Sequence, residues 1–380
     1  MRELKILYVT TISNTINAFL LPHIKMLVQE GHQVDVACNI VRPISEELIK
    51  LGCKVFRTEF QRTPLSESNF VAYKKLKKLI IEEKYNLIHT HTPVASACVR
   101  LACRKMKDVK VVYTAHGFHF YKGAPLKNWL IYFFIEKWLS RYTDMIITIN
   151  KEDYLRAKKL FKAKRIEYIP GIGFDTSRLM VTVDKSKKRK ELGIPEDSFI
   201  ILSIGELNKN KNHQVVIKAI AKLNIPDIYY LVCGNGAMKD YLRKMTKELA
   251  IEKKVKLLGY RYDIAEILKC ADVFAFPSFR EGLSVALMEA MASGLPIVCS
   301  NIRGNSDLVE DKLGGFLVEP YNVNGFSNAI EVLYNSKELR KRFGNYNVKS
   351  ISKYSIENVI KEMKILYSHF IPEIKRANFN

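Results

Sequence analysis

Residues 276–300 read FPSFREGLSVALMEAMASGLPIVCS, and this stretch decides the fold of the chain. The apolar run Val273–Phe276 that leads into it predicts a buried strand. Ser284 is a good N-cap for a helix over residues 285–293, which a glycine and a proline then end. A second buried strand begins at Ile297. Strand, loop, helix and strand in this order form one unit of a parallel α/β sheet.

The start of this predicted helix is suited to bind an anion. Backbone N–H groups around Leu283, Ser284 and Val285 open the helix, where the helix dipole favours negative charge. Glu281 precedes this site, and Glu289 lies one to two turns inside the helix. A carboxylate on each side of a diphosphate suits a sugar nucleotide, because each can accept hydrogen bonds from hydroxyls. The simpler alternative is a loop glutamate and a solvated helix glutamate.

The same residues carry a resemblance to a known family. Glu281 and Glu289, placed around Gly282-Leu283-Ser284, resemble the paired-glutamate motif of the retaining GT-B glycosyltransferases of family four. Residues 290–298 (AMASGLPIV) match the usual continuation of that motif. The resemblance implies that Glu281 meets the donor sugar and that Glu289 meets the nucleotide ribose. It also implies an α/β fold of two Rossmann-like, doubly wound parallel-sheet domains that face a cleft. Within the family, the sequence most resembles the CapM-type capsular polysaccharide glycosyltransferases.

Alternating strand and helix patterns extend this α/β fold over most of the chain. The clustered breakers of residues 170–175 (PGIGFD) mark the best crossover between two domains. We expect an N-terminal acceptor-side domain over residues 1–170 and a C-terminal nucleotide-sugar-binding domain over residues 171–353. The resemblance implies that a helix over residues 354–380 crosses back and packs on the first domain.

The composition is that of a globular but strongly basic protein. The 380 residues are 48% hydrophobic and carry a formal net charge of +22, which indicates an anionic partner. The basic residues do not gather into a helix-turn-helix or an RNA-binding pattern, so we expect no nucleic acid. Seven cysteines without paired spacings predict reduced, buried thiols in a cytoplasmic protein. The chain begins with a strand pattern, and we expect no signal peptide.

The first strand, over residues 4–9, leads into a polar segment over residues 10–17. We expect this segment to be a loop that faces the cleft, because ligands bind at the carboxyl ends of strands in doubly wound sheets. It lacks the GxGxxG pattern, so the sequence does not predict a dinucleotide site. We place Asn17 on the acceptor side, with a loop or helix-capping asparagine as the alternative.

Histidines stand where two predicted strands end. His91 follows a strand near residues 87–90, and His116 and His119 follow a strand over residues 111–115. His116-Gly117 resembles the family position whose histidine lies near the donor sugar, and we place His119 on the acceptor side. No carboxylate stands at ligand spacing from these histidines, so we expect no metal and no cofactor.

Aromatic and basic residues recur at helical spacing over residues 122–141. One interpretation is a core helix, and the other is an interfacial helix whose aromatic side chains enter lipid while its lysines meet anionic headgroups. Lys74, Lys75, Lys77 and Lys78 add a basic helix face. No apolar run reaches the ~18 residues of a membrane span. We therefore expect peripheral attachment to an anionic membrane surface, at the inner face of a bacterial cell membrane.

A second phosphate-binding element is predicted after a strand over residues 199–204. Gly205 opens a loop that carries Lys211 ahead of the next helix, which is a reasonable phosphate clamp. The resemblance implies that Lys211 binds the phosphates, with Lys209 as a weaker candidate. In the family an arginine usually occupies the place of Glu206, so one of two expected cations is missing here.

Two further segments complete the predicted donor side. The turn Gly234-Asn235-Gly236 resembles the family's Gly-x-Gly, with an ordinary tight turn as the alternative. The resemblance places the nucleotide base beside Arg261, whose side chain either stacks on the base or is exposed. Asp263 is predicted to cap the helix that follows. Residues 304–311 have the composition of a loop and turn.

The resemblance, taken with these features, implies a retaining, metal-independent glycosyltransferase. We expect it to move an N-acetylated amino sugar from a nucleotide diphosphate sugar, a UDP sugar, to a polyprenyl-diphosphate-linked saccharide in capsular or exopolysaccharide biosynthesis. Lys211 and the helix start at Ser284 stabilise charge on the departing diphosphate, Glu281 positions the sugar, and His116 lines it. A sugar-nucleotide epimerase of the same fold is the alternative, and it would change the donor without an acceptor.

Overall fold

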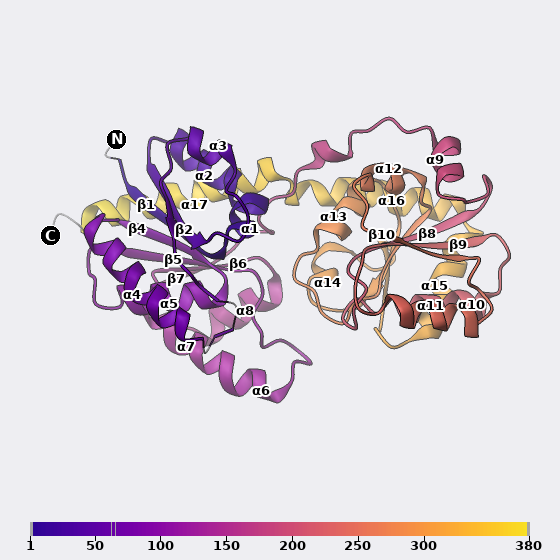
Figure 1. Ribbon diagram of the computed structural model, residues 1–380, viewed down its shortest axis with the longest axis horizontal. Coiled ribbons are helices and arrows are strands. Elements are labelled where there is room, and N and C mark those ends of the chain that lie inside the picture. Colours follow the sequence, from indigo (N-terminus) through magenta and orange to yellow (C-terminus); the bar gives the residue numbers. More distant parts are fainter. Residues whose placement is uncertain (1–2, 62, 65, 378–380) are drawn as a thin grey trace. The chain divides into compact units, whose positions relative to one another are not determined.

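The structure is a computed structural model that describes residues 3–61, 63–64 and 66–377. The chain folds into two compact units (Figure 1). The first comprises Met1–Gly173 with Ile356–Asn380, and the second comprises Phe174–Ser355. Residues 378–380 of the predicted C-terminal helix lie outside the described residues.

The first unit is built on a parallel sheet. Its strands in the described residues pair in the order β3-β2-β1-β4-β5-β6-β7. They are β1 Lys5–Ile12, β2 Gln33–Asn39, β3 Val55–Arg57, β4 Leu87–His91, β5 Lys110–Ala115, β6 Met145–Thr148 and β7 Arg165–Tyr168. The main helices are α2 Leu21–Gln29, α3 Glu46–Lys50, α4 Glu67–Glu82, α5 Pro93–Cys103, α7 Phe134–Leu139, α8 Lys151–Leu160 and α17 Ile356–Ala377.

Helices cover both faces of this sheet, because side chains along a strand point alternately to its two faces. Ile6 and Tyr8 of β1 pack in one apolar cluster with residues of α2 and α17. Leu7 and Val9 pack in another cluster with residues of α4 and α5. Strands buried on both faces read as continuous apolar runs, as these do in the sequence.

The C-terminal helix α17 belongs to the first unit (Figure 1). Val359, Met363 and Tyr367 are buried in the cluster that contains β1 and α2. The Tyr367 hydroxyl also bonds to the Tyr8 hydroxyl at 3.2 Å and to His89 Nδ1 at 2.6 Å. This helix therefore completes the core of the unit that holds the start of the chain.

The second unit repeats the same topology. Its strands in the described part of the chain pair in the order β10-β9-β8-β11-β12-β13, and every pair is parallel. They are β8 Phe199–Ile204, β9 Ile228–Cys233, β10 Val255–Gly259, β11 Val273–Phe276, β12 Ile297–Ser300 and β13 Gly315–Val318. The main helices are α9 Lys185–Glu191, α10 His213–Leu223, α11 Lys239–Glu248, α12 Ile264–Cys270, α13 Val285–Ala292, α15 Val323–Asn335 and α16 Lys337–Ile351.

Both sheets have a topological switch point, where the direction of strand order reverses. It lies between β1 and β4 in the first unit and between β8 and β11 in the second. Open α/β sheets bind ligands outside the carboxyl ends of the strands at this point. The loops that follow these four strands are thus the places to look for a site.

Three sequence-based expectations need correction. The polar segment 10–17 is not a loop: β1 continues to Ile12 and a helix begins at Ser13, because the Thr10 and Thr11 hydroxyls find partners inside the fold. Residues 304–311 contain a short helix, α14 Asn305–Leu308, before which the N-cap residue Gly304 donates its N–H to Asp307 Oδ2 at 3.2 Å. Polar residues satisfied locally do not force a loop.

The third correction concerns residues 122–141. The segment is α6 Leu126–Asn128, a π-helical turn Trp129–Phe133, and then α7, so the regular helical spacing is interrupted. One side packs on the core, where Phe120 contacts Trp129 and Phe133. The other side exposes Leu130, Phe134 and Trp138. The core interpretation therefore describes one side of the segment, and the interfacial role of the exposed side stays a prediction.

All seven cysteines are buried and free, as the sequence predicts. Within the described residues, no helix is both long enough and apolar enough to cross a membrane.

Candidate active site

The switch point of the second unit brings two predicted site residues together. Lys211 lies in the loop after β8, and Glu281 lies in the loop after β11. Lys211 Nζ donates to Glu281 Oε1 at 2.7 Å, and the ammonium also lies 4.7 Å from the centre of the Phe276 ring. The two side chains are 20% and 12% exposed. A cation and a carboxylate are therefore held at one partly desolvated place at the carboxyl ends of the strands.

Backbone and amide hydrogen bonds hold these two loops side by side. Asn212 Nδ2 donates to the carbonyls of Pro277 at 3.1 Å and Pro320 at 2.8 Å. Its backbone has φ 51°, a left-handed conformation that asparagine tolerates better than most residues. Asn210 adds a second tether through its carbonyl, which accepts from Phe279 N at 2.8 Å. The sequence pattern did not point to Asn212, although an asparagine before a helix is a known signal for such a conformation.

The helix that was expected to bind an anion is α13. Ser284 occupies its N-cap position, and in the described structure its side chain makes no capping hydrogen bond to the first turn. Gly282 lies in the loop just before it, against Gly304: a Cβ at Gly304 would lie 1.8 Å from the Gly282 carbonyl oxygen. Only glycine fits there, at φ 84°. This close packing fixes the path of the chain that leads from Glu281 to the start of α13, through Leu283 to Val285.

Glu289 lies half-buried on α13, where burial raises the pKa of its carboxyl above the ordinary value and Arg178 opposes the shift. A solvated helix glutamate would show no such burial. The structure therefore argues against the simpler alternative that Glu289 is an exposed helix residue.

The glycine turns of the predicted donor side pack against one another. Gly234 has φ 153°, and a Cβ there would lie 2.0 Å from the Gly205 carbonyl oxygen. The Asn235 carbonyl accepts from Leu207 N at 3.0 Å, which joins the loop after β9 to the loop after β8. Glu206 is exposed, and its carboxylate accepts from Asn208 Nδ2 at 3.0 Å. Gly205 and Asn235 therefore shape the backbone beside Lys211.

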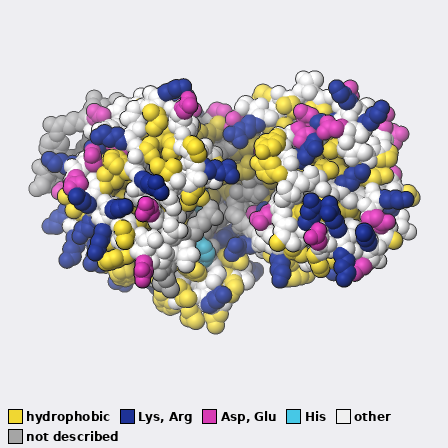
Figure 2. Space-filling model, in the orientation of Figure 1, with side chains coloured by type: hydrophobic (Ala, Val, Ile, Leu, Met, Phe, Trp, Pro, Cys, Tyr) yellow, Lys and Arg dark blue, Asp and Glu magenta, His cyan; other side chains and the backbone are white. Residues whose placement is uncertain are grey.

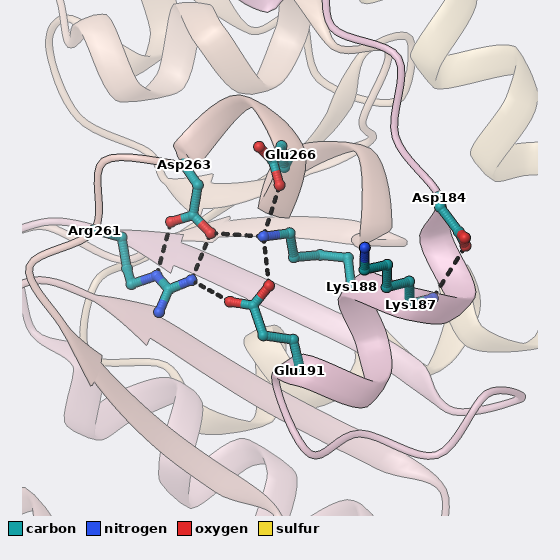
Figure 3. Close-up of polar contacts among 7 residues, drawn as sticks. All are labelled: Asp184, Lys187, Lys188, Glu191, Arg261, Asp263 and Glu266. Atoms are coloured by element: carbon teal, nitrogen blue, oxygen red, sulfur yellow. Dashed lines mark hydrogen bonds and ion pairs between the residues drawn. The ribbon is translucent and has the colours of Figure 1, made fainter.

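Arg261 belongs to an ion-pair network that also includes Lys188 of α9 (Figure 3). Arg261 Nε donates to Asp263 Oδ1 at 2.7 Å, and Arg261 Nη2 donates to Glu191 Oε1 at 2.8 Å. Lys188 Nζ contacts Glu191 at 2.8 Å and Asp263 at 3.0 Å, and it also contacts Glu266. The Arg261 guanidinium lowers the pKa of Asp263 to about 2, and the hydrogen bond that Lys188 donates to Glu191 raises the pKa of Lys188.

This network corrects the expected role of Asp263. It stands at the N-cap position of α12, but in the described structure its side chain makes no capping bond and instead binds Arg261. The reason is the stronger attraction of a carboxylate to a guanidinium than to a neutral amide. Arg261 is consequently fixed in place, with Tyr260 and Tyr262 exposed on either side of it.

The first unit gathers its predicted histidines at the ends of β4 and β5. His91 Nδ1 and His116 Nε2 are 3.0 Å apart and share a hydrogen bond, and the His91 ring stacks on His89 at 4.4 Å. Burial lowers the pKa of His116 to about 4 and places the pKa values of His89 and His91 well below their usual range. The cluster is therefore neutral near pH 7.

The two residues assigned to the acceptor side differ in their surroundings. His119 stacks on Tyr132, with ring centres 4.7 Å apart, and lines a cavity beside the ends of β1 and β4. Asn17 uses both ends of its amide within the fold: Nδ2 donates to the Pro43 carbonyl at 2.8 Å and Oδ1 accepts from Ser45 N at 3.1 Å. The acceptor role of each residue stays a prediction, and the geometry favours it for His119. No group of three or more potential metal-ligating side chains exists in the part of the chain that the structure describes.

Two family models match the chain, one in each unit. The model "Glycosyl transferase 4-like" matches residues 5–150, and the model "Glycosyl transferases group 1" matches residues 184–350. The chain is 37% identical to EpsD of Bacillus subtilis (strain 168), over 97% of each protein. It is 30% identical to the UDP-Gal:alpha-D-GlcNAc-diphosphoundecaprenol alpha-1,3-galactosyltransferase of Escherichia coli, over 91% of this chain and 92% of that protein.

Solved structures agree on the fold. The crystal structure of Anabaena Alr3699/HepE in complex with UDP and glucose superimposes with a TM-score of 0.77 at 20% identity, over 97% of this chain and 100% of that one. Sucrose-phosphate synthase from Thermosynechococcus elongatus gives a TM-score of 0.79 at 20% identity, over 98% and 100% of the two chains. The predicted GT-B fold is thereby confirmed. The chain belongs to the glycosyl transferases group 1 family and is a glycosyltransferase.

Proposed function

We propose that this glycosyltransferase moves a sugar from a UDP sugar to a saccharide linked to polyprenyl diphosphate, with retention of anomeric configuration. The observation that carries the proposal is the Lys211–Glu281 pair, 2.7 Å apart, at the switch point of the second unit. The relative from Escherichia coli supports the choice of substrates, since its name gives UDP-Gal as donor and a GlcNAc-diphosphoundecaprenol as acceptor. The transferred sugar that we propose is an N-acetylated amino sugar, and the product is a capsular or exopolysaccharide precursor.

The residues of the second unit suit the departure of a diphosphate. In the transfer step the bond between the sugar anomeric carbon and the diphosphate oxygen breaks, and negative charge grows on the diphosphate. Lys211 and the N–H groups at the start of α13 supply positive charge for it. Glu281 accepts hydrogen bonds from the sugar hydroxyls, and Glu289 accepts them from the ribose. Gly205, Asn235 and Arg261 shape the donor side.

The acceptor hydroxyl forms the new bond to the anomeric carbon on the face that the diphosphate leaves. Its proton passes to a diphosphate oxygen, so this step needs no protein base. His116 is proposed to line the donor sugar as a neutral imidazole, which matches a pKa of about 4. With Lys211 and the helix dipole balancing the charge of the diphosphate, the proposal includes no metal requirement.

The test is a screen of nucleotide sugars with the purified protein and a synthetic polyprenyl-diphosphate-linked GlcNAc, read by mass spectrometry. The panel holds UDP-GlcNAc, UDP-GalNAc, UDP-Gal and UDP-Glc, each with and without EDTA. NMR of the product then gives its anomeric configuration. An inverted product, or loss of turnover in EDTA, would contradict the corresponding part of the proposal. A new sugar nucleotide formed from donor alone would favour an epimerase.

We further propose that the first unit attaches to an anionic membrane surface at the inner face of the cell membrane. Lys74, Lys75, Lys77 and Lys78 are all exposed on α4, and Leu130, Phe134 and Trp138 are exposed on the segment 126–139. Figure 2 shows hydrophobic and basic side chains together over the region where Figure 1 draws α6. Exposed apolar and basic groups act together in interfacial binding.

Flotation with vesicles of phosphatidylglycerol and phosphatidylcholine tests this attachment. Changing the four lysines of α4 to glutamate should abolish co-flotation, since each basic group contributes roughly 1 kcal/mol near an anionic surface. In the matched control, four exposed lysines of the second unit are changed to glutamate instead. They are Lys218, Lys244, Lys247 and Lys253. Equal loss in both variants would show that net charge alone governs binding and would remove α4 from the proposal.

A further inference from the structure

The first unit contains an apolar groove that the transfer step does not use. Its volume is about 530 Å³, and it lies among α4, α5, the segment after β5 and the helical segment 126–139. Apolar and aromatic side chains make up much of its wall, among them Phe70, Tyr73, Val94, Ala97, Leu101 and Phe120. A volume of this size is in the range of ligand sites in proteins.

A smaller cavity of about 340 Å³ adjoins this groove. The two share five lining residues, which are Pro64, Pro93, Val94, His119 and Tyr132. The smaller cavity adds three threonines, Thr11, Thr15 and Thr92, beside the ends of β1 and β4. A compartment that carries threonine side chains at the switch point of the sheet therefore continues into a more apolar groove, an arrangement that suits an amphiphile.

The junction of the two compartments is a strained part of the backbone. Thr92 has φ 68° and ψ 141°, a conformation that β-branched residues almost never adopt. Three hydrogen bonds hold its side chain there: Thr92 Oγ1 accepts from Thr11 N at 3.1 Å, bonds to Thr11 Oγ1 at 2.7 Å and donates to the His91 carbonyl. Strain of this kind is kept mainly at functional sites. Thr92 also precedes α5, whose N-terminal dipole favours an anion beside Pro93.

Two apolar side chains of the groove lining reach the surface. Phe70 and Ile135 are 60% and 45% exposed. Lys74 Nζ lies 4.5 Å from the centre of the Phe70 ring, and the groove lining also contains Arg104 and the carboxylates of Glu67 and Glu136. Hydrocarbon can therefore enter along Phe70 and Ile135, with one lysine beside the entry.

We propose that this groove binds the first isoprenoid units of the lipid-linked acceptor, while the diphosphate and saccharide occupy the smaller cavity. The inference rests on the function proposed above, which supplies the chemistry of the acceptor. An apolar groove that runs into a smaller compartment, with threonine side chains and the N-terminus of α5 beside it, complements a hydrocarbon chain that ends in a diphosphate. A bulk phospholipid is the competing occupant.

Binding of geranylgeranyl diphosphate, measured by calorimetry below its micelle-forming concentration, tests the groove without any transfer reaction. The wild type should bind it at least tenfold more tightly than inorganic diphosphate, because only the former buries hydrocarbon. Ala97→Trp, which fills the groove, should remove that difference. Leu101→Gln is a second variant, which makes the wall polar without filling it. Val71→Trp is the control, because Val71 is 49% exposed on α4 and outside the groove lining.

Three outcomes would overturn the proposal. The first is equal binding of geranylgeranyl diphosphate and inorganic diphosphate by the wild type. The second is unchanged binding of geranylgeranyl diphosphate by both groove variants, each checked for its thermal melting temperature. The third is that dihexanoyl phosphatidylglycerol binds as tightly as geranylgeranyl diphosphate, which would make the groove a general lipid site.

Transfer assays separate this proposal from the proposed function. The KM for an acceptor with a long isoprenoid chain should be at least tenfold lower than for one with an octyl chain, and Ala97→Trp should abolish that ratio. Transfer to both acceptors with equal KM would overturn the groove while the function stands. Tight isoprenoid binding without transfer to any diphosphate-linked saccharide would overturn the function while the groove stands.

Discussion

In both units the sheet reverses its strand order at one point, yet the loops at the two points carry opposite chemistry. The loops after β8 and β11 bring an ion pair, Lys211 with Glu281, next to the start of a helix. The carboxyl ends of β1 and β4 and the residues that follow them present threonines and a neutral histidine, and an apolar groove continues from them. The comparison teaches that strand order fixes where a site lies, while loop residues decide what it can bind.

Lys211→Ala is the sharpest test of this contrast. We expect turnover to fall about 10²–10³-fold, because the variant removes a positive charge from a partly desolvated diphosphate site. Steady-state kinetics with saturating donor measure it. The control is Lys218→Ala, exposed on the following helix α10, which should stay within about twofold of wild type. A small effect of Lys211→Ala would mean that the second unit does not stabilise the leaving group through this cation.

Glu281→Gln tests the other half of the pair. We expect about a 10²-fold loss of turnover, since an amide replaces the charged acceptor of the sugar hydroxyls. The double variant with Lys211→Ala should lose less than the product of the two single effects, because residues in contact are not independent. If the fold-loss of turnover in the double variant equals the product of the two single fold-losses, the two side chains act at separate steps.

The histidine cluster makes the first unit sensitive to acid. A histidine whose folded pKa is lowered binds its proton more readily in the unfolded chain, so the free energy of unfolding should fall as the pH drops from about 6.5 to about 4. Each such histidine contributes up to ~1.4 kcal/mol per pH unit in that window. Urea unfolding at pH 7.5 and pH 5.5 measures the loss. His116→Gln should reduce the slope; an unchanged slope would assign the sensitivity to other groups.

Glu289→Gln should raise the donor KM several-fold with a smaller change in turnover, because ribose contacts do not involve the reacting bond. Burial raises the pKa of this carboxyl, so in the wild type donor KM should rise as the pH falls toward that pKa and the carboxylate takes up a proton. The variant should lack this dependence. Identical pH profiles for the donor KM would place Glu289 outside the donor site.

The smallest effect is expected from Lys188→Met. Lys188 holds Asp263 and Glu191, which in turn hold Arg261 (Figure 3), so the change should loosen Arg261 without touching the donor. A rise of about two- to fivefold in the dissociation constant Kd for UDP is expected, with turnover almost unchanged. The control is Lys187→Met, exposed on the same helix α9. No difference between the two variants would limit the network to a structural role.

The sequence predicts a structural feature well when the residues that determine this feature are neighbours in the sequence. The elements around residues 276–300 were predicted well, because apolar runs, an N-cap and helix-ending residues lie within a few positions of one another. The strand ends that carry His91 and His116 were also predicted, and their hydrogen bond follows from the pairing of β4 with β5. The sequence therefore identified the edges of the sheets at which polar residues gather.

Contacts between distant segments could not be predicted in this way. Lys211 and Glu281 are 70 positions apart, and nothing near either residue indicates that they pair. The left-handed backbone of Asn212 and the strained backbone of Thr92 depend on hydrogen bonds to other loops. The apolar groove depends on the packing of α4, α5 and the segment 126–139, which the π-helical turn shapes.

The return of α17 to the first unit has a consequence for synthesis on the ribosome. Residues 174–355 are translated, and can fold as a complete unit, before the helix that covers β1 and α2 has been made. Until then, apolar side chains such as Ile6, Tyr8 and Ile24 lack the cover of Val359 and Met363. The apolar surface of the nascent N-terminal segment therefore stays partly exposed until α17 has been synthesised. We expect chaperones to bind this segment mainly during that interval.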